Sequence, residues 1–297
     1  EKYDIHPIYI AKDRTWYTGK MLMDMDIYRD FDTLKRYAKK VTLYNSDGIF
    51  KLQSLGLFKS TVTDLDIVLP IVHGNNMEDG TLQGYLELVG IPYVGSGVLG
   101  SSLGQDKVVM KQVFKAMDLP IVDYCWFFDT EYLDDSTEIL DRIDKLGYPV
   151  VVKPATLGSS VGINYVASAD SIKDAIDDAI KYDTKIVVEK AVSNLLEVNC
   201  SVLGNYNYQQ TSVIEEVIPS DEILTYKDKY VGGSKKTGSS KGMVSASRVI
   251  PARIDSKMEE EIKEISKKAF VALNLSGVCR IDYLVDKKTK KIYINEP

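Results

Sequence analysis

The sequence has few of the residues that most often carry metal or nucleophilic chemistry. It contains two histidines, His6 and His73, and neither lies in a metal-binding spacing such as His-Glu-x-x-His. The three cysteines, Cys125, Cys200 and Cys279, are far apart and odd in number. They form no zinc motif, and they fit buried thiols in a reducing cytosol better than a disulfide framework. Catalysis by a cysteine–histidine pair or by zinc is therefore not favoured.

Long apolar runs and an excess of positive charge are also lacking. No run of 18 or more apolar residues occurs, and the first residues do not combine a basic segment with an apolar one, as a signal peptide would. The 37 Lys and Arg against 43 Asp and Glu leave a net charge of −6. This balance argues against nucleic acid or an anionic membrane as the partner. We expect a cytoplasmic protein of two or three domains with small-molecule substrates.

The first third of the sequence predicts an α/β layer. Residues 65–72 form an almost unbroken apolar run, typical of a strand buried on both faces of a parallel sheet. A helical pattern follows over 81–89 and ends at Gly90, and residues 91–94 predict another short strand. The order of strand, helix and strand indicates a β-α-β unit.

The rest of the chain alternates helices and strands. Helical patterns occupy 106–117 and begin again at Ser256, where Glu259 completes a capping-box spacing. Residues 148–190 predict a strand, a glycine-rich loop, a strand, a helix and a strand. Residues 278–285 and 292–296 flank a lysine-rich turn and predict a hairpin, whereas 231–240 predict a mobile surface loop.

Two glycine clusters compete as phosphate-binding loops. Gly95–Gly100 matches G-x-G-x-x-G, with Asp123 about 20 residues further on, as in a dinucleotide fingerprint. A strand and a helix precede this cluster, however, whereas the fingerprint usually opens its fold. We therefore favour a tight turn that needs small residues, and an NAD(H)-binding oxidoreductase stays a distant alternative.

The second cluster lies between two predicted strands. It runs from Lys153 to Gly162 and contains Gly158, Ser159 and Ser160. A hairpin loop of glycine and serine can fold over a triphosphate with its backbone N–H groups, and a lysine at the strand end adds a positive charge. Alone, such a loop is more often just a flexible turn.

Carboxylates gather on the predicted C-terminal hairpin. Arg280 and Asp282 lie two apart on one strand, so their side chains share a face. If the hairpin is symmetric about Thr289, Glu296 lies directly opposite Asp282. Two opposed carboxylates suit Mg²⁺, which completes its shell with phosphate oxygens and water. An arginine–carboxylate surface pair is about equally compatible with this pattern.

The motifs in their order resemble those of the D-alanine–D-alanine ligases, along essentially the whole chain. This family consists of ATP-grasp enzymes of peptidoglycan synthesis and includes the D-alanine–D-serine and D-alanine–D-lactate ligases of vancomycin resistance. The motifs that carry the resemblance are His73-Gly74, Glu78-Asp79-Gly80, Gln105-Asp106-Lys107, Lys153-Pro154, Gly158–Gly162, Glu189-Lys190, Lys229-Tyr230, Arg280-Ile281-Asp282 and Asn295-Glu296.

The resemblance implies a mixed α/β chain with the ATP-grasp fold and a Rossmann-like domain before it. The expected domains are residues 1–100, a central ATP-grasp subdomain over 101–190, and a C-terminal ATP-grasp subdomain over 191–297 that carries a lid loop at 224–242. It further implies ATP and Mg²⁺ or Mn²⁺, with two ions, and a cytoplasmic homodimer. The implied reaction joins D-alanine to a second D-amino acid through a D-alanyl phosphate.

The resemblance also assigns roles to individual residues. Those implied to take part in catalysis are His73, Ser159, Tyr230 and Arg280. Those implied to contact ATP are Lys107, Lys153, Gly158, Ser160, Glu189, Lys190, Val192, Glu197 and Lys229. Those implied to hold the metal are Asp282 and Glu296. Glu197 follows Glu189 with one residue more than the family pattern.

The chain departs from the family at both ends. The family's N-terminal strand and glycine-rich turn have no counterpart here, and the asparagine that would complete the metal site falls at position 298. We therefore expect full activity in a longer parent protein. Another ATP-grasp carboxylate–amine ligase and a catalytically silent nucleotide-binding module remain alternatives.

Overall fold

The computed structural model describes residues 2–56, 60–158, 161–218 and 247–297. The chain divides into two compact units. The first comprises Glu1–Pro70 and Gly84–Val94, and the second comprises Ile71–Gln83 and Gly95–Pro297. Within the described ranges no helix is both long and apolar enough to cross a membrane. The expected mixed α/β fold class is confirmed.

The first unit is built on an antiparallel sheet in which each strand pairs with the next in sequence. Its strands are β1 (Ile8–Ile10), β2 (Trp16–Thr18), β3 (Lys39–Ser46), β4 (Ile49–Ser54) and β5 (Thr61–Leu65). Short 3-10 turns at Lys20–Met23 and Met25–Arg29 lead into α1 (Phe31–Tyr37). Tyr17, Leu22 and Leu34 form a small core between these segments.

The strand predicted at 65–72 is wrong for most of its length. β5 ends at Leu65, and beyond it Val68 pairs with Tyr93 in a single parallel bridge. Ile67, Leu69 and Ile71 are exposed. Of the predicted β-α-β unit, only this one bridged pair remains, with one residue before and one after α2 (Thr81–Val89). The helix ends at Gly90 as expected. An apolar run becomes a buried strand only where flanking strands satisfy its backbone and other elements cover its faces.

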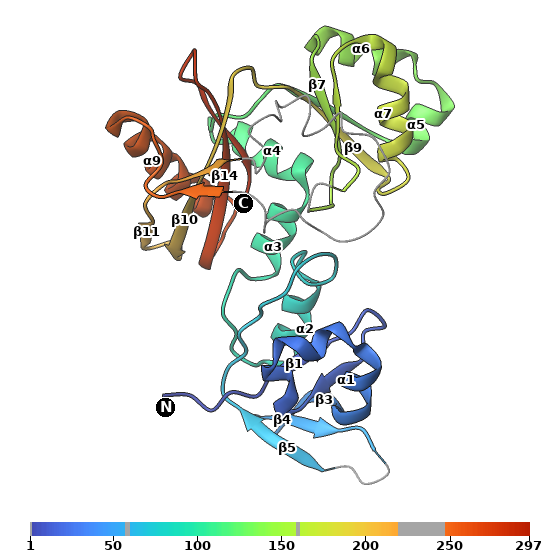
Figure 1. Ribbon diagram of the computed structural model, residues 1–297, viewed down its shortest axis with the longest axis vertical. Helices are drawn as coiled ribbons and strands as arrows, with labels where there is room; N and C mark the ends of the chain where they lie inside the picture. Colours follow the sequence, from blue (N-terminus) through green and yellow to red (C-terminus); the bar gives the residue numbers. More distant parts are fainter. Residues whose placement is uncertain (1, 57–59, 159–160, 219–246) are drawn as a thin grey trace. The chain divides into compact units, whose positions relative to one another are not determined.

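The second unit contains a four-stranded antiparallel sheet in the order β6-β9-β7-β8. The strands are β6 (Tyr124–Phe128), β7 (Val150–Pro154), β8 (Asn164–Val166) and β9 (Lys185–Lys190). The helices α5 (Asp129–Asp134), α6 (Thr137–Leu146) and α7 (Ile172–Ala179) lie on one side of it, as Figure 1 shows. Along the chain, β7, β8, α7 and β9 follow one another as predicted for 148–190.

Alternation along β7 and β9 separates the two faces of this sheet. Val150 and Val152 pack with Ile186 and Val188 in the core beneath α6 and α7. The residues between them point to the opposite face, because successive strand residues alternate. Val187 on that opposite face packs against a different helix, α4 (Lys107–Ala116).

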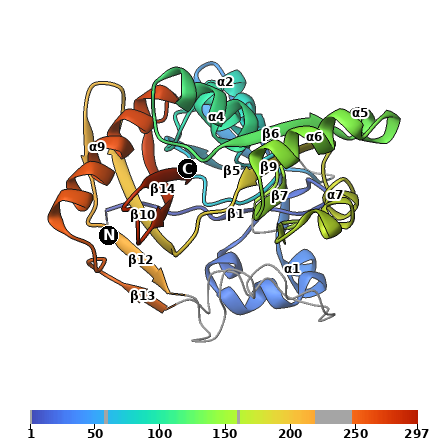
Figure 2. The same ribbon diagram turned by 90° about the horizontal axis from the view of Figure 1, so that it is seen from above.

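A second sheet in this unit has the order β13-β12-β10-β14-β15, with β11 on β10. Its strands are β10 (Leu195–Gly204), β11 (Gln209–Thr211), β12 (Glu215–Ile218), β13 (Ser247–Val249), β14 (Gly277–Asp286) and β15 (Ile292–Glu296). α9 (Ser256–Ala272) packs beside β10 and β14 (Figure 2). The predicted hairpin and helix are confirmed, but Asp255, not Ser256, caps the helix by accepting from Met258 N.

Helix α4 (Lys107–Ala116) packs against both sheets of the second unit. Met110 and Phe114 join the core formed with α9, whereas Val108 packs against Val187 of β9. A helix placed in this way can present polar side chains to the space between the two sheets.

The first glycine cluster has a structural role. Gly277 has φ +74°, and a Cβ there would lie 2.9 Å from Gly95 Cα. Ser96 and Ser276 exchange hydrogen bonds through N–H, hydroxyl and carbonyl groups. α3 (Val98–Gln105) begins directly after this contact. The favoured interpretation, a turn that needs small residues, therefore agrees with the close approach of two backbone segments.

Candidate active site

Lys107 and Lys111 of α4 point toward the same site. Hydrogen bonds at the N-terminus of the helix hold it in the position that allows this. Asp106 caps α4 by accepting from Val108 N and Val109 N, and Lys107 N donates to Ala155 O of the loop after β7. Lys107 and Lys111 are four residues apart, so they share a helix face. The two residues are 6 % and 0 % exposed, which makes them two buried cations on one helix.

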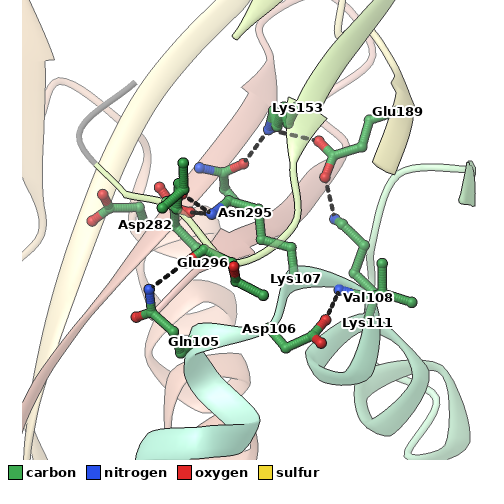
Figure 3. Close-up of polar contacts among 12 residues, drawn as sticks. Gln105, Asp106, Lys107, Val108, Lys111, Lys153, Glu189, Asp282, Asn295 and Glu296 are labelled. Carbon is green, nitrogen blue, oxygen red and sulfur yellow. Dashed lines mark hydrogen bonds and ion pairs between the residues drawn. The ribbon is translucent and has the colours of Figure 1, made fainter. Parts of the chain in front are cut away.

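The register of β7 and β9 brings a third lysine to a glutamate. Val151 pairs with Glu189, and Lys153 lies two residues beyond Val151, so Lys153 and Glu189 share the sheet face that α4 covers. Their side chains meet with Lys153 Nζ 2.7 Å from Glu189 Oε2. Lys111 Nζ lies 3.1 Å from the other oxygen, Oε1 (Figure 3).

Opposing effects set the charge of this buried glutamate. Burial alone would raise the pKa of Glu189, but the fields of Lys111 and Lys153 outweigh it and lower the pKa from 4.5 to about 2. Burial lowers the pKa of Lys111, and Glu189 opposes that change. Glu189 is therefore ionised at neutral pH, and the charges of Lys111 and Lys153 are what keep it ionised.

A β-bulge turns two neighbouring residues of β15 toward these lysines. Tyr283 pairs with Ile294, whereas Asp282 pairs with Glu296, so Asn295 is an extra residue between the two pairs. A bulge of this kind redirects side chains that strict alternation would place on opposite faces. Asn295 Oδ1 accepts from Lys153 at 3.2 Å, and Glu296 Oε2 lies 3.1 Å from Lys107 Nζ.

The predicted opposition of Asp282 and Glu296 is confirmed by this pairing. Burial raises the pKa of Asp282. Arg280 opposes that rise, whereas Glu296 and Glu197 add to it. Burial would likewise raise the pKa of Glu296, but Lys107 and Lys153 outweigh it and lower the pKa. A divalent cation between the two carboxylates would relieve their repulsion.

Arg280 forms the arginine–carboxylate pair that the sequence left open. Its Nε lies 2.6 Å from Asp282 Oδ1 and its Nη2 lies 2.8 Å from Oδ2, both within hydrogen-bond distance. This bidentate contact fixes the guanidinium on the same sheet face as the carboxylates. The pair and the metal hypothesis are compatible, because Asp282 and Glu296 still face each other.

The oxygen ligands offered by Asp282 and Glu296 fit a magnesium-type ion. The facing groups are carboxylates, and Mg²⁺ needs one or two of these when phosphate and water supply the rest. Across the described residues, no group of three or more His, Cys, Asp or Glu side chains forms a self-sufficient metal cage. The site suits an ion that arrives together with a phosphate ligand.

Contacts at the start of the glycine-rich loop connect it to the end of α3, to the start of α4 and to the segment just before β9. Gln105 Nε2 donates to Thr156 O at 2.6 Å, and Lys107 Nζ donates to Leu157 O at 2.7 Å. Asp183 Oδ2 accepts from both Thr156 N and Thr156 Oγ1. The first part of the loop is therefore held against the lysine cluster, and Gly158, which follows, is exposed.

The segment predicted to bind the base follows Glu189. Lys190 directs its ammonium to the carbonyls of Gly147 and Tyr148, at 2.8 and 2.9 Å. Val192 is buried in a small apolar cluster with Leu284. The backbone and not the Lys190 side chain is thus what this segment offers to a ligand.

Glu197 lies on β10, where Leu284 is its partner on β14. Asn199, two residues on, pairs with Asp282, so Glu197 shares the face of the carboxylates.

His73 is not among the residues that these contacts bring together. Its side chain is 87 % exposed, and its Nδ1 lies 3.8 Å from Glu78 Oε1 of the same loop. Four further predicted residues, Ser159, Ser160, Lys229 and Tyr230, lie outside the described residues. The loop predicted at 231–240 and the whole lid at 224–242 also lie outside them.

Sequence reasoning left Lys111 and Asn295 out of the predicted site. Lys111 could have been found because it interrupts the buried face of α4, which carries Val108, Met110 and Phe114. Asn295 was named only as part of the Asn295-Glu296 motif, and its orientation depends on a bulge that the pattern of the hairpin does not reveal.

Comparison with known families gives matches over nearly the whole chain. The family described as D-ala D-ala ligase N-terminus matches residues 1–96, and the one described as D-ala D-ala ligase C-terminus matches residues 113–297. The D-alanine–D-alanine ligase of Thermosipho melanesiensis is 38 % identical over 298 residues, covering 100 % of this chain and 76 % of that protein. The corresponding ligase of Acetivibrio thermocellus is 37 % identical over 307 residues, covering 100 % and 78 %.

Solved structures agree with these sequence matches. A D-alanine–D-alanine ligase from Coxiella burnetii has a TM-score of 0.76 at 28 % identity, covering 97 % of this chain and 73 % of that one. The VanG D-Ala:D-Ser ligase from Enterococcus faecalis has a TM-score of 0.78 at 27 % identity, covering 99 % and 80 %.

Proposed function

The chain belongs to the D-alanine–D-alanine ligase family, whose members ligate D-amino acids for cell-wall synthesis, and we propose that it joins D-alanine to a second D-amino acid, D-alanine or D-serine, through a D-alanyl phosphate. One observation carries the assignment of the site. Buried lysines from α4 and β7 converge with the opposed carboxylates of β14 and β15. This is the combination of cations and metal-binding oxygens that phosphoryl transfer from ATP requires.

The proposal divides the chain into three domains. We assign residues 1–100 to the domain before the ATP-grasp, 101–190 to the central subdomain and 191–297 to the C-terminal subdomain. The lysines and Glu189 then come mainly from the central subdomain and the carboxylates from the C-terminal one. ATP would bind where these two subdomains face each other.

The first chemical step activates a carboxylate, which is by itself a poor electrophile. An oxygen of the D-alanine carboxylate attacks the γ-phosphorus, the bond from this phosphorus to the bridging oxygen breaks, and ADP leaves. Lys107 and Lys153 would bind the phosphate oxygens, with the loop from Gly158 to Gly162 over them. When bound, Mg²⁺ or Mn²⁺, as two ions held through Asp282 and Glu296, neutralises charge on the transferring phosphoryl group.

The second step forms the peptide bond. The amine of the second amino acid attacks the acyl carbon, the tetrahedral oxyanion collapses, phosphate leaves and the amine gives up a proton. Arg280 would stabilise the oxyanion, because its guanidinium is already oriented by Asp282. His73, Ser159 and Tyr230 would position the D-alanine, and water must be kept from the acyl phosphate.

Nucleotide recognition would involve Glu189, which contacts Lys153, and the segment that follows Glu189 in the chain. Glu189 with the backbone of Lys190 to Val192 would read the adenine. Glu197 would hold the ribose, and Lys229 would lie near the γ-phosphate. A cytoplasmic homodimer completes the proposal.

Phosphate release tests this function directly. The protein is mixed with ATP, Mg²⁺ and D-alanine, and inorganic phosphate and the dipeptide are measured. We expect release that requires D-alanine, with L-alanine as the inactive control. D-serine and D-lactate as second substrates then distinguish the three ligase types. ATP binding without any stimulation by a D-amino acid would instead indicate a silent nucleotide-binding module.

A further inference from the structure

Lys111 is a cation in the core to which the family resemblance assigns no role. Its side chain is 0 % exposed and lies on the buried face of α4. Burying an ammonium away from water is unfavourable, and a methionine would fill similar space without that cost. The lysine at this position therefore calls for a reason other than packing.

The partner of Lys111 is a carboxylate that also binds a site lysine. Lys111 Nζ lies 3.1 Å from Glu189 Oε1, and Lys153 Nζ lies 2.7 Å from Glu189 Oε2 (Figure 3). The ring of Tyr124, whose residue pairs with Glu189 between β6 and β9, lies 5.8 Å from Lys111 Nζ. Glu189 is thus divided between a lysine of the core and a lysine that faces Asn295.

Charge in this cluster depends on Lys111. The cluster holds the cations Lys107, Lys111 and Lys153 and the anions Glu189 and Glu296. With Lys111 present it has an excess of one positive charge, and without it the charges balance. The whole carboxylate of Glu189 would then turn to Lys153 and compete with an incoming phosphate for the same ammonium.

We propose that Lys111 is a positioning residue that holds Oε1 of Glu189 in the core, so that Lys153 keeps positive charge for a nucleotide phosphate. The inference rests on the nucleotide binding proposed above. It assigns Lys111 no contact with the nucleotide. Its effect passes through Glu189 to Lys153 and is larger on the phosphate part of the ligand than on the adenine.

Calorimetric titration with ATP, ADP and adenosine tests this inference. Lys111→Met is compared with wild type and with Lys115→Met, which removes the same charge from an exposed position of the same helix. We expect Lys111→Met to weaken ATP and ADP about tenfold and adenosine much less, because Glu189 also lies beside the proposed adenine site, whereas Lys115→Met leaves all three unchanged. Unchanged ATP affinity, or an equal loss for adenosine and ATP, would overturn the inference.

A second pair of variants covers the case in which Lys111→Met does not fold. Glu189→Gln is compared with the double variant Lys111→Met/Glu189→Gln, which leaves no charge unpaired between these two positions. Equal ATP affinities are expected, because Lys111 has no carboxylate to act through in either protein. A further loss in the double variant contradicts the inference. A wild-type protein that binds none of the nucleotides contradicts the proposed function itself.

Discussion

Asp282 and Glu296 face each other across the β14–β15 hairpin because β15 carries one extra residue, Asn295, at this point. Without that bulge, the register that joins Tyr283 to Ile294 would place Asn295 opposite Asp282. The bulge therefore supplies two polar side chains to one face. Glu296 meets Lys107, and Asn295 meets Lys153. A local irregularity of the hairpin is what joins the carboxylates to the lysine cluster.

Replacing Asp282 tests the metal role of this hairpin. Asp282→Asn removes one of two facing carboxylates, so we expect the Mg²⁺ concentration for half-maximal phosphate release to rise about tenfold or more. Asp174→Asn on the exposed face of α7 is the matched control and should leave the Mg²⁺ dependence as in wild type. An unchanged Mg²⁺ requirement in Asp282→Asn would contradict the assignment.

Arg280→Ala separates stabilisation of the oxyanion from binding of the nucleotide. We expect kcat to fall by about 10²–10³, the effect of removing one such donor, with the ADP dissociation constant within about twofold of wild type. Steady-state kinetics and calorimetry measure the two quantities. Arg29→Ala, on an exposed 3-10 turn, should change neither. The reverse pattern, intact turnover with weak ADP binding, would place Arg280 on the nucleotide.

Lys153→Ala is expected to act on ATP binding. It removes a buried ammonium at the end of β7, and we expect the ATP dissociation constant to rise about tenfold or more, with a smaller change in kcat. Titration with ATP and kinetics at saturating ATP provide the two values. Lys181→Ala, which alters an exposed lysine, is the control. Loss of kcat with unaltered ATP affinity would argue against this role.

Glu189 makes folding stability depend on pH. Its pKa is lowered from 4.5 to about 2 in the folded chain. The ionised folded form is therefore favoured above the unfolded pKa, and this contribution, about 3 kcal/mol in order of magnitude, is lost as pH falls through that range. The free energy of unfolding should drop more steeply between pH 5 and 3 in wild type than in Glu189→Gln. Parallel profiles would show that Glu189 is not the source.

Gly277→Ala tests the contact beneath α3. Its φ of +74° disfavours a side chain, and a Cβ would lie 2.9 Å from the backbone of Gly95. We expect a loss of about 1–3 kcal/mol in the free energy of unfolding. Gly56→Ala, where φ is not in the left-handed region and nothing lies within 4 Å, should change it by less than about 0.5 kcal/mol. Chemical denaturation measures both, and equal stability of the two variants would dispute the close approach.

Local pattern was a good guide wherever neighbouring residues decide the structure. The alternation and turn residues of 278–296 predicted the hairpin, and the spacing of apolar residues predicted α4, α7 and α9. The same reasoning was wrong for 65–72, where β5 ends at Leu65 and the apolar side chains of Ile67, Leu69 and Ile71 are exposed. Whether such a run forms a buried strand depends on partners that are distant in sequence.

The helices, the C-terminal hairpin and the order of motifs that indicates an ATP-dependent ligase can be predicted from the amino-acid sequence, because they depend on short-range periodicity and on residue type. The combination of charges at the site, in contrast, comes from the folded arrangement. That arrangement placed the two oxygens of Glu189 between Lys111 and Lys153, and it turned Asn295 and Glu296 to one face. The reason is physical: the charge state of a buried group is set by desolvation and by ions within a few ångströms, and these come from strands and a helix up to about 190 residues apart in the chain.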